Sequence, residues 1–204
     1  ITHPTSPSQV LPQYYNHAAL STHGTLLNWH VALLDFQPSP RRRLGAVILV
    51  NALPPGLRMS RVFDLKGSSR NRSASDKDKA KECPLLKDND LRAMTSPLQL
   101  HPKACGALRE RLRADCELLM SLDLMDYSLL LGVAEGVPEE DLRALGLQGP
   151  GHSAALSGPG PPMSPGMSFR RPLYNVFPAA EEGRIYACAI IDVLQKYTMK
   201  KKAE

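Results

Sequence analysis

The amino-acid sequence predicts a mixed α+β fold, because one long helical pattern and several short strand patterns occur in the same chain. Residues 103–122 carry apolar side chains at helical spacing, whereas the runs at 44–50, 129–134 and 185–191 are short and apolar. The length of 204 residues suits one domain and allows a substantial core.

Composition and charge narrow the class of partner. The chain has 25 basic and 20 acidic residues, a net charge of +5, which favours an anionic partner. Aromatic residues make up only 5% and do not alternate with basic ones, which argues against nucleic-acid binding. The four cysteines have no CxxC spacing and fit a reducing intracellular setting. No apolar run approaches the roughly 18 residues that span a bilayer.

The amino-terminal segment is expected to be irregular. Pro4, Pro7 and Pro12 lie within residues 1–12 and discourage a long helix there. A short helix is therefore predicted only from residue 14 to residue 21.

A β-hairpin is predicted next. Residues 26–34 and 44–50 indicate two strands, joined by a loop over residues 37–43 that ends in three arginines. His30 lies inside the first predicted strand, and we interpret it as a structural residue rather than a ligand. Residues 51–56 then form a Pro/Gly connector of the kind that joins two lobes.

A further strand is predicted at residues 59–65, directly before Lys66. The charge-rich stretch that follows, residues 70–87, is interpreted as a solvated loop or helical face, and the alternative is a dedicated phosphate-binding patch.

The strongest helix signal covers residues 103–122. Its apolar side chains follow one another at spacings of four, four, four and three and form one stripe. The stripe consists of Ala104, Leu108, Leu112, Cys116 and Leu119. The charged residues of this segment, among them Arg111 and Asp115, fall mostly off the stripe.

The composition changes sharply near residue 146. Gly and Pro dominate residues 146–168, which bury too little apolar surface to offset their ordering entropy, so a disordered insertion is predicted. A strand at 185–191 follows and ends at Asp192. A basic tail, residues 200–202, closes the chain.

The order of these elements suggests a site for phosphoryl transfer. Asp126 follows the long helix and Asp192 follows a strand. Such a site needs one carboxylate near the attacking hydroxyl, another for a metal, and a lysine for the phosphate oxygens. Lys66 is the candidate lysine. Taken singly, either aspartate is better interpreted as the cap of a turn, and only the motifs around them favour the functional role.

Three stretches carry a family resemblance. They are Asp64-Leu65-Lys66-Gly67-Ser68, Met125-Asp126-Tyr127-Ser128-Leu129-Leu130 and Ile190-Ile191-Asp192-Val193-Leu194-Gln195. In this order they resemble the signature motifs of the phosphatidylinositol phosphate kinases, and the chain looks like a divergent relative of that family's type I members. Residues 47–54 and 11–15 resemble the family's hinge strand and the end of its small-lobe helix.

The resemblance implies roles for individual residues. Asp126 would be the catalytic acid/base that orients the inositol hydroxyl, and Asp192 would hold Mg²⁺ and the phosphates of ATP. Lys66, with Gly67 and Ser68, would line the site near the phosphates or the lipid headgroup. The residues expected to flank adenine are Val50, Asn51 and Leu53.

The resemblance also implies a kinase-like α+β arrangement that is truncated at the small lobe and at the carboxy-terminal specificity loop. Residues 10–53 would be a remnant of the small lobe and hinge, and residues 54–204 the large lobe. No residue of this chain matches the family's glycine-rich nucleotide loop or its strand lysine. Groups of this kind commonly contribute rate factors of about 100 or more each. We therefore expect weak or no lipid kinase activity from these residues alone.

Two functions follow from the resemblance. The first is an ATP- and Mg²⁺-dependent kinase that converts phosphatidylinositol 4-phosphate to the 4,5-bisphosphate. The alternative is a non-catalytic scaffold that binds an active type I relative and the membrane. Either way, the expected partners are phosphoinositide lipid and an anionic membrane surface, and the expected location is peripheral, at the cytoplasmic face of membranes.

Overall fold

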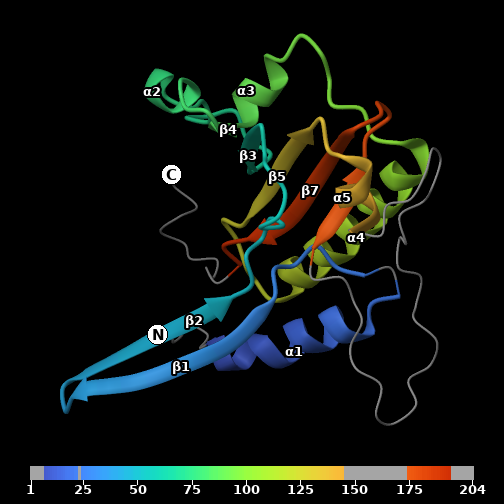
Figure 1. Ribbon diagram of the computed structural model, residues 1–204. Helices are drawn as coiled ribbons and strands as arrows, with labels where there is room; N and C mark the ends of the chain where they lie inside the picture. Colours follow the sequence, from blue (N-terminus) through green and yellow to red (C-terminus); the bar gives the residue numbers. More distant parts are fainter. Residues whose placement is uncertain (1–6, 23, 145–173, 194–204) are drawn as a thin grey trace.

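The computed structural model describes residues 7–22, 24–144 and 174–193, which form two β-sheets with helices around them (Figure 1). In chain order, the elements are α1 (Pro7–Leu20), β1 (His30–Ser39), β2 (Arg42–Leu49), β3 (Arg61–Leu65), α2 (Asp76–Lys79), β4 (Leu85–Lys87), α3 (Asp88–Arg92), α4 (Pro102–Ser121), β5 (Ser128–Glu135), α5 (Glu139–Ala144), β6 (Asn175–Pro178) and β7 (Arg184–Ile191). The predicted mixture of helices and strands is confirmed.

The larger sheet has five strands in the order β4-β3-β5-β7-β6. β3 runs parallel to β4, and the other neighbouring pairs are antiparallel. Leu65 at the end of β3 pairs with Leu129, and Ile191 at the end of β7 pairs with Ser128 at the start of β5. The segments that follow β3 and β7 and the segment that precedes β5 therefore lie at the same end of the sheet, where these three inner strands stop.

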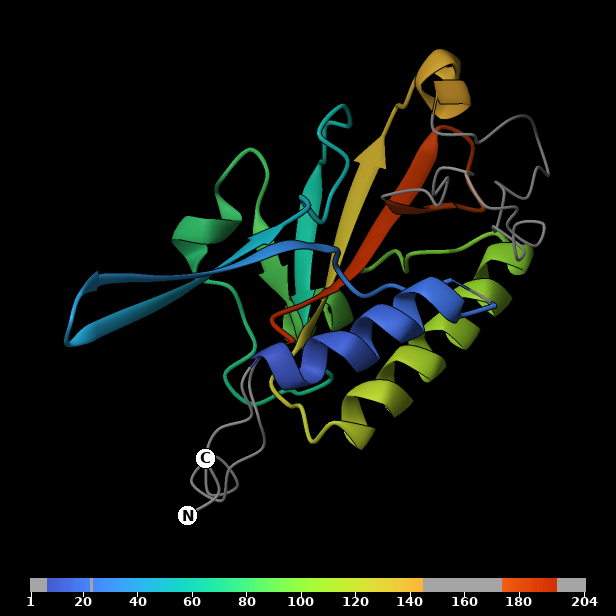
Figure 2. The same ribbon diagram turned by 90° about the horizontal axis from the view of Figure 1, so that it is seen from below.

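Helices α1 and α4 lie side by side against one face of this sheet (Figure 2). Alternate strand residues point to that face, because side chains alternate along a strand. Phe63, Val133 and Tyr186 contribute to the buried core from the sheet, and Leu119 and Tyr14 contribute from α4 and α1. The core thus lies between the sheet and the two helices.

Helix α4 confirms the prediction for residues 103–122, and two of the charged residues that lie off its apolar stripe are buried. Asp115 is fully buried and accepts hydrogen bonds from Thr25 Oγ1 and the Leu26 N–H. Arg111 is 5% exposed and donates to the Asn175 side chain. Hydrogen bonds from distant segments compensate the burial of these charges, which helical periodicity alone does not reveal.

Helix α1 corrects the expectation of an irregular amino-terminal segment. The helix begins at Pro7 and continues through Pro12 to Leu20. Pro7 occupies the first helical position, where the missing N–H costs nothing. Val10, Tyr14 and Ala18, spaced four apart, are all buried. Their packing against the core outweighs the one helical hydrogen bond that Pro12 cannot make.

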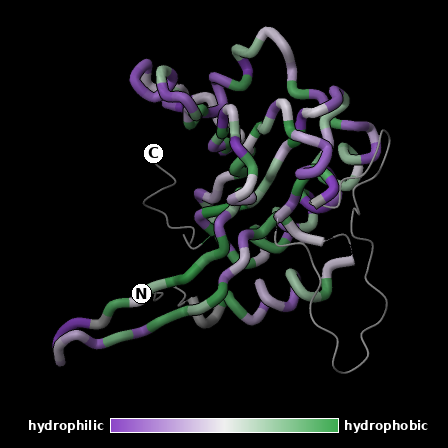
Figure 3. Tube along the Cα trace, viewed as in Figure 1, coloured by the Kyte–Doolittle hydropathy of each residue, from purple (hydrophilic) through white to green (hydrophobic). Residues whose placement is uncertain are grey.

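The predicted hairpin is present as β1 and β2, with different limits. The strands pair up to Ser39 and Arg42, so the connection is a tight turn rather than a loop over residues 37–43. Residues 26–28 belong to a different contact, since the Ile190 N–H donates to the Leu26 carbonyl (2.7 Å) and the Asn28 N–H to the Ile190 carbonyl (3.0 Å). The hairpin projects from the body, and its arms are largely hydrophobic while its tip is hydrophilic (Figures 1 and 3).

Two predictions lie outside the described residues: the disordered insertion at 146–168 and the basic tail at 200–202. The charge-rich stretch at 70–87 forms α2 and, through β4, the edge of the sheet. Among the described residues, none of the helices has the length and apolar character needed to cross a bilayer.

Candidate functional site

Lys66, Asp126 and Asp192 line one cavity of about 250 Å³ at one end of the five-stranded sheet. Each follows or precedes an inner strand at this end: Lys66 follows β3, Asp126 precedes β5, and Asp192 follows β7. The complete lining is Asn28, His30, Leu49, Lys66, Asp126, Ile190, Ile191, Asp192 and Val193. The topology thus brings together one base and two acids that are far apart in the sequence.

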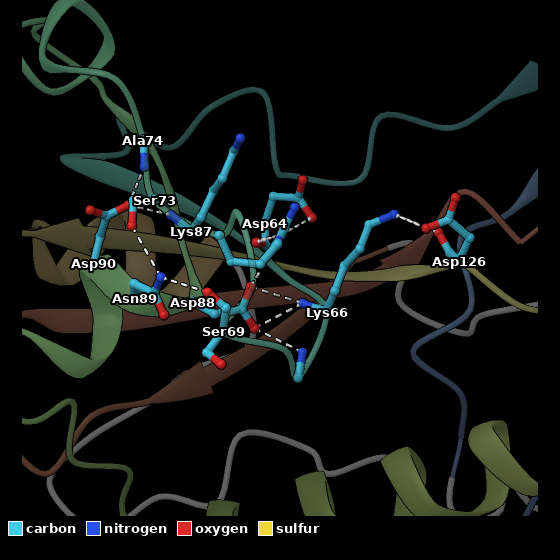
Figure 4. A network of polar contacts seen from close by, with 12 residues as sticks. Asp64, Lys66, Ser69, Ser73, Ala74, Lys87, Asp88, Asn89, Asp90 and Asp126 are labelled. Atoms are coloured by element: carbon cyan, nitrogen blue, oxygen red, sulfur yellow. Dashed lines mark hydrogen bonds and ion pairs between the residues drawn. The ribbon is translucent and has the colours of Figure 1, made fainter. Parts of the chain in front are cut away.

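The Lys66 side chain reaches from the end of β3 to Asp126, which lies just before the neighbouring strand β5 (Figure 4). Its ammonium donates to the Asp126 carboxylate and, at 2.9 Å, to the Asp126 backbone carbonyl. The two side chains are 26% and 31% exposed, so water screens the pair, and an exposed ion pair contributes only about 0.2–1 kcal/mol. The contact therefore fixes orientation more than it stabilises the fold.

Asp126 and Asp192 both have left-handed backbone conformations, with φ of 65° and 61°. Among the described residues, only Asn71 and Asp123 share this conformation outside glycine. Aspartate tolerates it better than most residues, because its short side chain can hydrogen-bond locally. A backbone of this kind is often found at functional sites, where it directs a side chain that a regular strand would point elsewhere.

The backbone around Lys66 is held by Asp88 at the start of α3. One carboxylate oxygen of Asp88 accepts from the Lys66 N–H at 3.0 Å and from the Gly67 N–H at 2.8 Å. Burial raises the pKa of Asp88, but hydrogen bonds from Arg72 and from the Gly67 N–H outweigh this, so its pKa lies below the ordinary aspartate value. Asp88 is therefore a stable anion beneath the loop that carries Lys66.

Gly67 and Ser68 are exposed at the start of that loop. Gly67 has a φ of +70°, and no atom lies within 4 Å of the place where a Cβ would stand. The requirement for glycine here is thus conformational rather than steric.

His30 lies in the cavity wall, next to the lysine and the two aspartates. Its ring meets Tyr14 edge-on, with ring centroids 4.7 Å apart. Burial lowers the pKa of His30, and the hydrogen bond with the Asn28 backbone offsets this only in part. Sequence reasoning favoured a structural role for His30. The structure gives it both a packing partner and a place at the site.

None of the residues expected to flank adenine lines the cavity, although Val50 directly follows Leu49, which does. The Val50 N–H donates to the Trp29 carbonyl at 2.9 Å, and the Leu53 N–H donates to the Asn51 side chain at 3.3 Å. Leu53 packs over Gly132 of β5, where an added Cβ would meet Leu53 Cδ2 at 3.0 Å. From this region, Leu49 reaches the cavity.

Sequence reasoning missed Asp88, although a signal for it exists. Asp88, Asn89 and Asp90 are three consecutive polar residues directly after a strand, a pattern unsuited to a strand interior. Because the stretch before them has the composition of a solvated face, it gives no hint of their inward hydrogen bonds.

The Asp192 carboxylate suits a magnesium ion that is shared with a substrate. Within the described ranges, no group of three or more His, Cys, Asp and Glu side chains converges as a closed metal cage would require. Mg²⁺ typically takes one or two protein carboxylates, and phosphate and water oxygens complete its shell. Asp192, which lines the cavity, matches that pattern with one carboxylate.

The chain is similar in sequence to a family of lipid kinases. The family model described as Phosphatidylinositol-4-phosphate 5-Kinase matches residues 7–154. Mouse phosphatidylinositol 5-phosphate 4-kinase type-2 beta is 36% identical over 185 residues, which cover 77% of this chain and 44% of the relative.

Two further relatives give the same result. Rat phosphatidylinositol 5-phosphate 4-kinase type-2 alpha is 35% identical over 177 residues, covering 77% of this chain and 44% of the relative. Human phosphatidylinositol 4-phosphate 5-kinase type-1 beta is 33% identical over 215 residues, covering 96% of this chain and 39% of the relative. The chain therefore spans less than half the length of these relatives.

Proposed function

Because the chain belongs to the phosphatidylinositol phosphate kinase family, we propose that the cavity of Lys66, Asp126 and Asp192 is a phosphoryl-transfer site for phosphatidylinositol 4-phosphate. ATP would be the phosphate donor and the 4,5-bisphosphate the product. The observation that carries the proposal is convergence: one base and two acids from distant motifs line a single cavity.

Asp126 is the proposed acid/base. Its carboxylate would accept the proton of the attacking inositol hydroxyl, as positioned acids do in phosphoryl transfer. Lys66, which already contacts this carboxylate, would orient it and would stabilise the charge on the phosphate oxygens. The acid would thus act on the attacking hydroxyl, and the lysine on the phosphate that is transferred.

Asp192 is the proposed metal ligand. A bound Mg²⁺ would neutralise the charge of the phosphate oxygens. The left-handed backbone at Asp192 would direct its carboxylate into the cavity where ATP phosphates would lie. The adenine ring would lie towards Val50, Asn51 and Leu53, beside Leu49 of the cavity wall.

Gly67 and Ser68 are proposed to meet the phosphates or the lipid headgroup. Both are exposed and follow Lys66 directly, in the loop that Asp88 holds. An exposed hydroxyl and a backbone without a Cβ allow a phosphate to approach closely.

The identity of the lipid rests on the resemblance to type I enzymes. The names of the relatives include both 5-phosphate 4-kinases and a 4-phosphate 5-kinase, and all of them name a phosphatidylinositol monophosphate. Turnover assays therefore need both monophosphates, each offered in vesicles.

The first test is nucleotide binding by the 204-residue chain. Mg²⁺-ATP at about 100 times its dissociation constant stabilises a protein by about 2.7 kcal/mol. We expect a matching rise in melting temperature that Asp192→Ala abolishes. The matched control is Asp123→Ala, since Asp123 is also an aspartate with positive φ but does not line the cavity. A shift that survives Asp192→Ala, or no shift in a folded protein, would contradict the proposed site.

We further propose that these residues alone turn over lipid slowly. The resemblance assigns none of them to a glycine-rich nucleotide loop or to the lysine of the nucleotide-binding strand. The measurement is transfer of labelled phosphate from Mg²⁺-ATP to vesicles that contain either monophosphate. Rates in the usual range of enzymes, about 1 s⁻¹ or more, would refute this expectation.

A scaffold function is the second candidate, and the β1–β2 hairpin favours it. Val31, Phe36 and Ile48 are 64%, 46% and 47% exposed on a two-stranded sheet. Such a surface suits a protein partner, for which we propose an active type I relative at the cytoplasmic face of a membrane. Pull-down of purified type I kinase by the intact chain, lost on substitution of the hairpin residues, would support it. Equal capture by the substituted chain would count against it.

A further inference from the structure

Three consecutive residues at the start of α3 hold the loop that carries Lys66. We define the Lys66 loop as residues 66–74. Asp88, Asn89 and Asp90 each bind a different part of this loop, in the view of Figure 4. The contacts occur in order, so that Asp88 holds the part nearest to Lys66 and Asp90 holds the far end.

Asp88 makes the contacts closest to the cavity. It is 5% exposed and accepts from the Lys66 and Gly67 N–H groups and from Arg72 Nε at 2.8 Å. At Lys66 the chain has left β3, whose pairing with β5 ends at Leu65. The carboxylate of Asp88 therefore replaces the hydrogen bonds that the sheet no longer supplies.

Arg72 extends this support to the other side of Lys66. While its Nε binds Asp88, its terminal nitrogen donates to the Asp64 carbonyl and lies 3.2 Å from the Asp64 carboxylate. Its side chain is only 13% exposed. The backbone both before and after Lys66 is thus fixed by one buried ion pair.

Asn89 and Asp90 act farther out. Asn89 donates to the Ser69 carbonyl at 2.9 Å, and Asp90 accepts from the Ala74 N–H at 2.8 Å. Asp90 also binds the Lys79 ammonium at 2.8 Å. These contacts hold the loop beyond Gly67, whereas those of Asp88 hold Lys66 itself, which makes Asp90 a matched control for Asp88.

We propose that Asp88 is a positioning residue that sets the direction in which the Lys66 ammonium reaches Asp126. This inference deepens the proposed function and rests on it. A lysine side chain is long and flexible, so the place of its ammonium depends on a fixed backbone. A displacement of about 1 Å at such a group costs up to about a hundredfold in rate.

Asp88→Asn is the sharpest substitution, because it hardly changes the volume of the side chain. Asp88 accepts from the Gly67 N–H on one oxygen, from Arg72 Nε on the other, and from the Lys66 N–H on both, at 3.0 and 3.3 Å. The amide that replaces this carboxylate has only one accepting oxygen, so its NH₂ group would face one of these donors. In Asp90→Asn the NH₂ group can face the partly exposed Lys79 instead, and the backbone contacts survive.

The test measures how fast individual lysines of the intact chain react with a trace amount of an acetylating reagent, followed by mass spectrometry. We expect Asp88→Asn to raise the labelling of Lys66 at least about threefold and to leave Lys79 nearly unchanged. Asp90→Asn should do the reverse. Circular dichroism confirms that each variant is folded. This reciprocal pattern separates positioning from general loosening, which would raise both lysines together.

Unchanged Lys66 labelling in a folded Asp88→Asn variant, or equal increases in both variants, would overturn the inference. If Asp88→Asn does not fold, Arg72→Gln decides, because it removes the guanidinium that orients the Asp88 carboxylate and binds the Asp64 carbonyl, so the backbone on both sides of Lys66 loses support. It should raise Lys66 labelling, and no change would overturn the inference.

The labelling result does not depend on nucleotide. Suppose that Asp88→Asn raises Lys66 labelling but Mg²⁺-ATP does not raise the melting temperature of the wild-type protein. The positioning role of Asp88 would then be upheld, and the proposed function would be refuted. Where wild-type protein binds Mg²⁺-ATP, we expect Asp88→Asn to weaken binding about tenfold and Asp90→Asn to change it by less than about twofold. Equal weakening by both would again overturn the inference.

Discussion

Asp115 shows at the scale of one residue how a buried charge can join distant parts of the chain. It is fully buried on α4, and its carboxylate lies 2.6 Å from His17 Nε2 of α1. It also accepts from Thr25 Oγ1 at 2.7 Å and from the Leu26 N–H at 2.6 Å. These contacts fasten α1 and the segment that pairs with β7 to the long helix.

Removal of the Asp115 carboxylate should lower the free energy of unfolding substantially. Asp115→Ala leaves the Leu26 N–H and the Thr25 hydroxyl without their partner, and breaking a buried polar network of this kind costs about 3–5 kcal/mol. We expect such a loss in urea unfolding of the chain. Glu117→Ala, an exposed position on the same helix, should change stability by less than about 0.5 kcal/mol. Similar losses in both variants would show that the network is not specifically stabilising.

Residue-level prediction fails where it relies on polarity alone. Asp115 and Arg111 are buried although their charge predicts exposure, because hydrophobic periodicity cannot tell a solvated charge from a buried one with partners. Asp88 is missed for the same reason. The roles predicted for Lys66, Asp126 and Asp192 come from the resemblance of their sequence motifs to those of the family. The structure adds that all three line one cavity.

The β1–β2 hairpin is the element with the clearest consequence for solution behaviour. It is a two-stranded sheet with apolar side chains that remain exposed along both strands, including Leu34 at 44% and Leu49 at 48%. Unpaired strand edges with such side chains favour pairing with another chain. We therefore expect the isolated chain to self-associate or to require a partner.

Charged substitutions should relieve this tendency. Val31→Lys combined with Ile48→Lys places a lysine on each strand, and we expect a larger monomer fraction in light scattering with an unchanged circular dichroism spectrum. Met120→Lys is the control, since Met120 is 71% exposed on α4 and lies outside the hairpin. A wild-type chain that is a cooperatively melting monomer would contradict the prediction.

The elements themselves are predictable where one strong pattern covers them. The stripe of α4 and the apolar runs of β5 and β7 indicate positions within a few residues of those observed. The prediction for α1 is wrong because it gives more weight to Pro12 than to the four-residue spacing of Val10 and Tyr14, both of which are buried. Short elements such as β4 and α3 carry too few residues for periodicity to show.

At the scale of the whole molecule, the order of strands cannot be predicted from local patterns. β3 lies next to β5 although α2, β4, α3 and α4 come between them in the chain. Such pairing depends on long-range contacts that propensity does not encode. The match to residues 7–154 and the relatives at 33–36% identity establish the family, and the finer activity rests on the experiments above.

The separation of the site residues along the chain has a practical consequence. Lys66 and Asp126 are 60 residues apart, and Asp192 follows only after β7. Their shared cavity exists only in molecules in which β3, β5 and β7 have all assembled. A ligand of this cavity would therefore serve as an active-site titrant: the bound fraction at saturation would count the correctly folded molecules in a preparation.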